Sequence, residues 1–128
     1  MTYTFTKTLD ATMDEAVQHV TENLAARGFG ILTTIDVSAT LKKKLDVDFR
    51  PYVILGACNP EFAYKALQNE DKIGAMLPCN VILQEIGKDR VEVSAVDPVA
   101  SMQAVKNPKL AAIATEVRDL LKSVVHGL

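Results

Sequence analysis

The sequence predicts an α/β fold of the α+β type: a two-layer sandwich in which about five strands form one sheet and helices pack on it. Three observations support this prediction. Segments with the two-residue period of strands alternate with segments of helical period, turn residues separate them, and the last two strand segments are joined like a hairpin. The predicted order is β-α-β-α-β-α-β-β-α, within a single domain that spans residues 1–128. Strand order and pairing are left open.

The first strand and the first helix have clear local signals. From Thr2 to Leu9, threonines alternate with larger side chains, which is typical of a half-buried strand. Thr12 and Glu15 have the spacing of a capping box, and apolar residues follow at helical intervals. Gly28 supplies the left-handed residue that ends the helix.

A second strand is predicted over Gly30–Asp36, with a short helix after it. Ser38 is the expected N-cap of this helix. Leu41 and Leu45 are expected to face inward, and Lys42–Lys44 to lie mostly on the solvated face.

The third strand, Tyr52–Cys58, is apolar on both faces. Such a strand is buried on both sides, either centrally in the sheet or under a partner subunit. Asn59 and Pro60 then predict the start of a helix, since asparagine is a preferred N-cap and proline suits the first helical position.

The last part of the chain predicts a hairpin and a long helix. Val81–Ile86 and Arg90–Val96 alternate like strands, and Gly87–Asp89 has the composition of a tight turn. Asp97 and Pro98 break the second of these strands. Asn107 and Pro108 repeat the cap-plus-proline device, and a helix with an apolar face follows to His126.

Composition excludes several classes of protein. With 48% hydrophobic and 23% charged residues the chain is not disordered, and a net charge of −2 with no basic stripe argues against nucleic-acid binding. There is no apolar run long enough to span a membrane and no leader-like start, so we expect a soluble cytoplasmic protein with no membrane partner. Two cysteines are too few for a secreted disulfide framework.

No familiar cofactor or metal motif is present. Gly28–Thr33 faintly suggests a dinucleotide fingerprint, but it lies between a helix and a strand, which is the reverse of the required order. His19 and His126 are far apart, and no His-x-x-x-His or Cys-x-x-Cys spacing occurs. We therefore expect no metal and no cofactor.

The two cysteines mark the one candidate site. Cys58 ends a buried strand directly before a helix start, where the helix dipole and unpaired amides favour a thiolate. Cys79 follows Pro78 at the entrance to the next predicted strand, Val81–Ile86. Asn59 and Asn80 come directly after the two cysteines and could place amide donors near the thiols. The alternative is that both thiols are small buried hydrophobic groups.

Two aspartates complete the set of candidate ligand-binding residues. Asp36 and Asp97 each end a strand, and although turn residues are the simpler interpretation, either could face the edge of the sheet that carries the cysteines. The predicted ligand-binding residues are Cys58, Asn59, Pro78, Cys79, Asn80, Asp36 and Asp97.

The same segments carry a family resemblance. Gly28–Asp36, Tyr52–Pro60, Leu77–Val81 and Asp97–Pro98, with their Cys-Asn-Pro and Pro-Cys-Asn signatures, resemble domain-of-unknown-function family 302 over essentially the whole chain. Asp46 departs from the glycine of the family pattern, which affects only a turn. The resemblance implies a small two-layer α/β fold and a homodimer, and it brings no established activity, substrate or cofactor.

Three functional hypotheses remain open. The favoured one is a homodimeric module that binds a small molecule or another protein in a pocket near Cys58 and Cys79. The second is thiol-dependent redox or transfer chemistry, with Cys58 as nucleophile and Cys79 as resolving thiol. The third is a purely structural or regulatory dimer. No general base is evident in the sequence, so the balance is against an enzyme.

Overall fold

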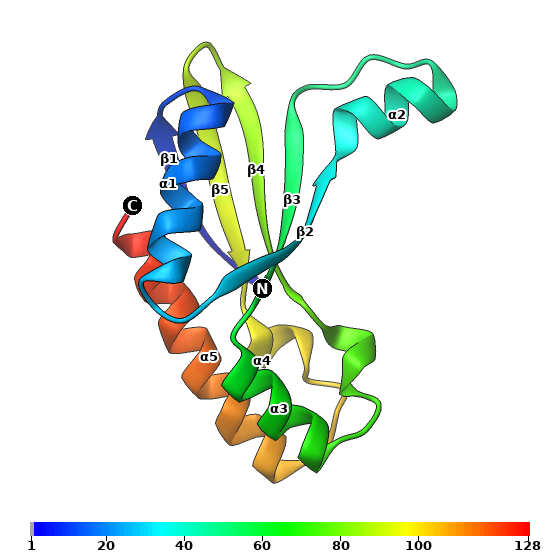
Figure 1. The fold of residues 1–128 in the computed structure, drawn as a ribbon, viewed down its shortest axis with the longest axis vertical. Coiled ribbons are helices and arrows are strands. Elements are labelled where there is room, and N and C mark those ends of the chain that lie inside the picture. Colours follow the sequence, from blue (N-terminus) through cyan, green and yellow to red (C-terminus); the bar gives the residue numbers. More distant parts are fainter. Residues whose placement is uncertain (1) are drawn as a thin grey trace.

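The computed structural model describes residues 2–128 as one five-stranded antiparallel sheet covered by helices (Figure 1). The strand order is β1-β5-β4-β3-β2, and every neighbouring pair is antiparallel. The two-layer α+β prediction is therefore confirmed, and the open question of pairing is answered. The strands are β1 (Thr4–Asp10), β2 (Gly30–Asp36), β3 (Tyr52–Cys58), β4 (Cys79–Gly87) and β5 (Arg90–Val96).

The helices divide between the body of the sheet and its two ends (Figure 1). Two long helices, the first and the last of the chain, lie side by side along one face of the sheet. The helices are α1 (Met13–Ala25), α2 (Val37–Leu45), α3 (Pro60–Asn69), α4 (Pro98–Ser101) and α5 (Pro108–His126), with a 3-10 turn, η1, over Ile73–Met76.

The main core lies between α1, α5 and the sheet. The register places Val81 opposite Ala95 and Leu83 opposite Val93, and all four side chains are buried beneath the helices. A smaller cluster, built from Ala66, Ile73 and Leu110, joins α3, η1 and α5 below the sheet. This second cluster holds α3 against α5 at the end of the sheet where β3 ends.

Helix caps explain why the helices start where they do. Thr12 and Glu15 form the predicted capping box at α1, and Asn59 and Asn107 cap α3 and α5 in front of a proline. The N-cap of α2 is Asp36, whose Oδ1 accepts from the amide of Ala39. The prediction of Ser38 as this cap is therefore wrong.

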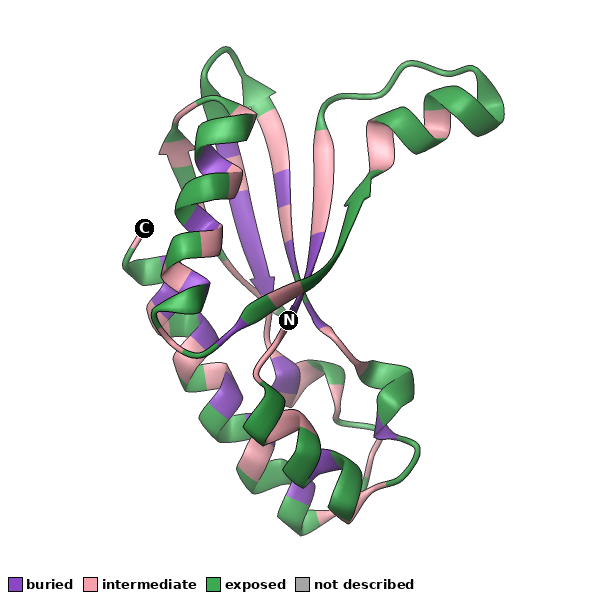
Figure 2. Ribbon diagram, in the orientation of Figure 1, coloured by how far each residue is buried: buried purple, intermediate pink, exposed green. Residues whose placement is uncertain are grey.

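Helix α2 and the segment after it, residues 37–50, project from the rest of the molecule; we call this segment the arm (Figure 1). None of the side chains of α2 is buried. Leu45 is 66% exposed, so the prediction that it faces inward is wrong. Figure 2 shows the contrast between the mostly exposed residues of β2 and α2 and the buried residues in α1, α5 and the strands they cover. Leu41, the other residue predicted to face inward, is of intermediate exposure, so the apolar side of α2 is only partly covered.

The third strand matches its predicted bounds and lies inside the sheet, between β2 and β4. Its burial is only partial: Leu55, Gly56 and Ala57 are buried, and the rest of the strand is of intermediate exposure. Three elements differ from the predictions. Strand β1 spans Thr4–Asp10 rather than Thr2 to Leu9. Strand β4 begins at Cys79 rather than at Val81, and Asp97 with Pro98 starts the short helix α4 instead of only ending β5.

Candidate functional site

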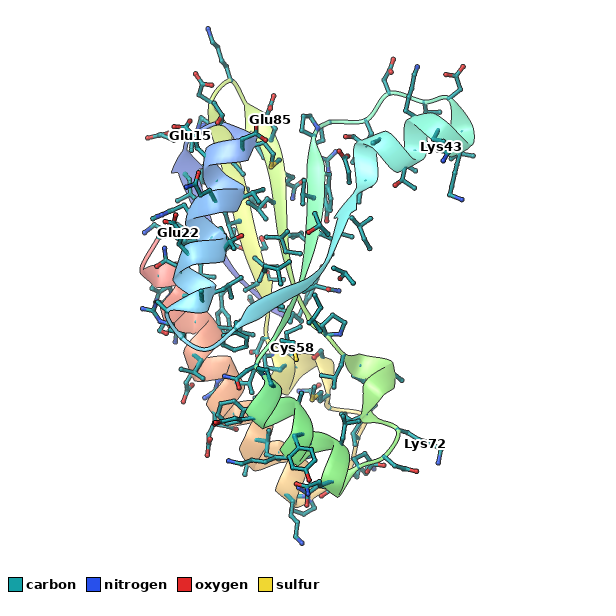
Figure 3. The ribbon with its side chains drawn as sticks, viewed as in Figure 1. Glu15, Glu22, Lys43, Cys58, Lys72 and Glu85 are labelled. Atoms are coloured by element: carbon teal, nitrogen blue, oxygen red, sulfur yellow. The ribbon has the colours of Figure 1, made fainter. Side chains whose placement is uncertain are left out.

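A pocket of about 350 Å³ lies where β3 ends and β4 begins, between α3 and α5. Figure 3 shows Cys58 at this junction of the sheet with the helices below it. The lining is almost entirely apolar. Its members from α3, α5 and the strand ends include Phe29, Leu32, Ala57, Cys58, Asn59, Phe62, Ala63, Leu67, Pro78, Cys79, Met102, Leu110, Ile113 and Val117.

Local sequence places Cys58 and Asn59 at the pocket. Strand β3 ends at Cys58, and Asn59 caps α3 by accepting the Phe62 amide on its Oδ1 at 3.5 Å. Gly28 has φ +83°, and a Cβ there would lie 3.0 Å from Asn59 Nδ2. A glycine at position 28 therefore both ends the α1 turn and lets the asparagine side chain approach the backbone.

Cys79 is the buried thiol of the pair. It lies opposite Ala57 at the first position of β4 and is only 8% exposed. Burial, with a smaller contribution from the charge of Cys58, raises the pKa of the Cys79 thiol to about 11. At neutral pH Cys79 is a neutral, apolar part of the pocket wall.

The strand register separates the two thiols in orientation. Cys79 is the partner of Ala57, so Cys58 is offset from it by one residue. Neighbouring residues on a regular strand project to opposite faces of the sheet. Both cysteines nevertheless line one pocket at the strand ends, where the charge of Cys58 acts on Cys79. They are not the directly opposite pair that suits a bridge between strands.

The pocket offers little for acid–base chemistry. Its lining, within residues 2–128, contains no histidine, acid, lysine or arginine. Asn59 and the two thiols supply the polar side-chain atoms. Such a lining can hold an apolar molecule and donate one directed hydrogen bond, but it brings no proton acceptor to a reacting group.

Pro78 belongs to two neighbouring cavities. It lines the first pocket and also a second cavity of about 250 Å³, where Asn80 lies. Gly56 allows this packing, because a Cβ there would come within 2.8 Å of Pro78 Cγ and 2.2 Å of Thr33 Oγ1. Asn80 is thus close to the candidate site in sequence but faces a different space.

The two aspartates do not join the thiols. Asp36 pairs with Val53, at the opposite end of β3 from Cys58, so the expectation that it faces the cysteine edge is wrong. Asp97 does lie at that edge, but its carboxylate caps α4 by accepting the amides of Val99 and Ala100. Both are cap residues, as their positions before helices require.

The helical side of the pocket does not emerge from the sequence. Phe62 and Ala63 of α3 and Ile113 and Val117 of α5 show only the spacing of helix faces directed inward. Their periodicity is the same whether they fill a core or line a cavity. The signal that separates the two cases is the packing of α3 on α5, which no single sequence shows.

Neither a metal cluster nor a membrane span is found in the described part of the chain. Over residues 2–128, no group of three or more histidine, cysteine, aspartate or glutamate side chains is arranged to hold a metal ion. None of the described helices is both long enough and apolar enough to cross a bilayer.

Comparison with known proteins assigns the family. The family model "Domain of unknown function DUF302" matches residues 5–128, and no curated protein matches the chain. The chain is similar to the crystal structure of an uncharacterized conserved DUF302 protein from Bacillus stearothermophilus, with 26% identity, 98% of each chain covered and a TM-score of 0.90. The shared fold and the match over nearly the whole length agree with the resemblance seen in the sequence. This chain belongs to the DUF302 family.

Proposed function

We propose that the protein is a cytoplasmic, homodimeric binding module that takes a small, uncharged, apolar molecule into the pocket beside Cys58 and Cys79. The observation that carries this proposal is the pocket itself. Its volume of about 350 Å³ falls within the usual range for small-molecule sites, and its lining is apolar with few polar groups.

The lining limits the chemistry of the ligand. A charged molecule would lose its hydration without gaining an ionic partner, which costs on the order of several kcal/mol for each buried charge. An apolar molecule gains about 25 cal/mol for each Å² removed from water. Asn59 uses its Oδ1 to cap α3, so its Nδ2 remains to donate to a carbonyl or hydroxyl oxygen on the ligand.

Two further parts of the proposal rest on other observations. Cys58 and Cys79 line one pocket as free thiols, which suits the reducing cytoplasm. The homodimer is supported by the exposed apolar side chains of the arm, among them Leu45 and Phe49, which a second copy would cover.

The two alternatives fit the geometry less well. Redox or transfer chemistry through Cys58 needs a resolving thiol, but Cys79 is buried, its pKa is raised, and it is offset from Cys58 in the register. A purely structural dimer needs no open pocket between α3 and α5. The geometry therefore favours a binding function over a catalytic one.

Binding of an uncharged fluorescent aromatic amine, N-phenyl-1-naphthylamine, tests the pocket. Ala63 lines it, so Ala63→Phe fills part of the space and should raise the Kd for the probe by roughly tenfold or more. Ala112 is exposed on α5, and Ala112→Phe should leave the Kd unchanged. Both variants are compared with wild-type protein by circular dichroism.

Two results would overturn the binding proposal. One is a wild-type protein that does not enhance the fluorescence of the probe at any concentration. The other is equal binding by Ala63→Phe and Ala112→Phe in proteins that are both folded, which would place the probe elsewhere on the surface.

A further inference from the structure

Strand β2 is an edge strand with an unusually bare outer side. It pairs only with β3 among the described strands, so its other row of backbone amides and carbonyls has no strand partner within residues 2–128. From Gly30 to Ile35 it carries no charge and no proline. Natural edge strands are normally protected by charges, prolines or bulges, because an unprotected edge pairs readily with another strand. In β2 the one such feature is a register shift against β3 between Ile31 and Thr33.

The side chains around this edge are apolar and exposed. Leu32 is 66% exposed and Ile35 45% exposed, and Leu45, Val47 and Phe49 of the arm are exposed as well. Helix α2 has nine residues and no buried side chain. A helix of this length is unstable in water unless it packs against something.

We propose that two copies of this chain pair through β2, antiparallel about a two-fold axis near Thr33, to form one continuous sheet across the dimer. The occupant is a second copy because the same bare edge on each chain satisfies the unpaired backbone groups of the other. A self-complementary patch of this kind is the usual form of a two-fold interface. The proposal specifies the surface of the homodimer proposed above and does not depend on ligand binding.

The charges favour this arrangement. With the axis near Thr33, Asp36 of one copy lies opposite Gly30 of the other, so the two Asp36 carboxylates are separated by roughly 20 Å along the strands. Lys42 is paired with Asp46 and Asp48 of its own arm. Lys43 and Lys44 of each arm are then directed toward the end of the other copy where α3 begins. The first turn of α3 carries Glu61, which is exposed. Opposite charges therefore meet at both ends of the interface.

The same arrangement closes the pocket. Leu32 and Leu67 line the pocket and are also exposed, so they form its open side. In the proposed dimer, the arm of the second copy lies near this open side, and its exposed Leu45 side chain would be buried there. In the dimer, the mouth of each pocket is thus bounded by the other chain, and ligand binding and assembly favour one another.

Sedimentation velocity over a concentration series tests the interface. The double variant Leu32→Lys and Ile35→Lys places like charges on both copies at the edge, and should raise the dimer dissociation constant on the order of 100-fold. Ile86→Lys is the matched control, because Ile86 is also 45% exposed but lies at the end of β4. It should leave the dimer unchanged.

A disulfide cross-link tests the interface independently if the lysine variants do not fold. Thr33→Cys places one thiol near the axis in each chain, and mild oxidation should join the two copies through a disulfide between the two introduced thiols, identified by peptide mass spectrometry. A monomeric wild type overturns both the dimer and this interface. A wild-type dimer that persists in the lysine variant, or that gives no such cross-link, overturns the interface alone, and probe binding is read separately in each case.

Discussion

The two edge strands of the sheet, β1 and β2, differ in whether a charged side chain protects them against pairing with another strand. At the β1 edge, Lys7 lies in the middle of the strand, in register with buried Val93, and its ammonium donates to the carbonyls of His126 and Leu128 at the end of α5. At the β2 edge, no charge precedes Asp36, and most of the strand is exposed. One edge carries an inward-pointing charge tied to the terminal helix, and the other carries none.

This difference shows which part of the molecule buries its own apolar side chains and which part leaves them exposed. In the part of the sheet formed by β1, β5 and β4, helices α1 and α5 cover the apolar side chains, and the central ones are fully buried. Beyond β3, the pocket, β2 and the arm leave apolar groups uncovered. Regions with few buried contacts open most easily and commonly carry binding functions.

The largest expected effect contrasts a substitution in each region. Leu83 is 0% exposed in the core, and Leu83→Ala should lower the free energy of unfolding by about 3 kcal/mol, because it removes buried methylenes and leaves a cavity. Ile35→Ala on β2 should change the unfolding free energy of the monomer by less than about 1 kcal/mol. Urea unfolding at low protein concentration, where the monomer is measured, gives both values.

The reverse order of these two effects would contradict the division of the molecule. If Ile35→Ala cost the monomer as much as Leu83→Ala, β2 would belong to the same cooperative core, and the need for a partner at this edge would disappear. If the loss of unfolding free energy caused by Ile35→Ala instead grows with protein concentration, the substitution weakens the dimer, which supports a partner at this edge.

A smaller, local effect concerns pH. Hydrogen bonds from the Ala39 amide, which has the larger effect, and from the Ser38 hydroxyl lower the pKa of the Asp36 carboxyl below its ordinary value of 3.8. The lowered pKa means that this carboxylate stabilises α2 above pH 3.8, and that its contribution is lost as the pH falls through the lower folded value. We expect amide exchange in α2 to accelerate there. Asp36→Asn, which keeps a capping oxygen without a titrating charge, should remove this pH dependence.

Helix α1 supplies the comparison for this prediction. The Thr12 backbone amide, followed by the Thr12 hydroxyl, lowers the pKa of Glu15 in the same manner. However, α1 also buries Ala16, Val20 and Leu24. Its amides should therefore stay protected through the same acid range. Equal acid sensitivity of α1 and α2 would show that packing does not distinguish the two helices.

Much of the fold follows from short-range signals in the sequence. The bounds of β2, β3 and β5 and the starts of α3 and α5 match the predictions, because turns, alternation and Asn-Pro caps are local. Strand order does not follow, since it depends on contacts between distant segments. Leu45 shows the same limit: helical spacing identifies an apolar face but does not say what covers it.

The candidate site is predictable from the sequence only in part. Cys58, Asn59, Pro78 and Cys79 do come together, because each lies at a strand end that antiparallel pairing brings to one edge. Asp36 is misplaced by sequence reasoning because parallel and antiparallel arrangements put it at different ends of the sheet. The helical wall and the buried state of Cys79 depend on the packing of α3 on α5.

The most direct test of the account is the alkylation rate of each cysteine at neutral pH, with and without saturating N-phenyl-1-naphthylamine. Cys79, buried and with its pKa raised to about 11, should react only when the protein opens. Cys58, which is partly exposed and lines the pocket, should react in the free protein and be protected by the probe. A Cys58 rate that the bound probe does not change would contradict the pocket as the binding site.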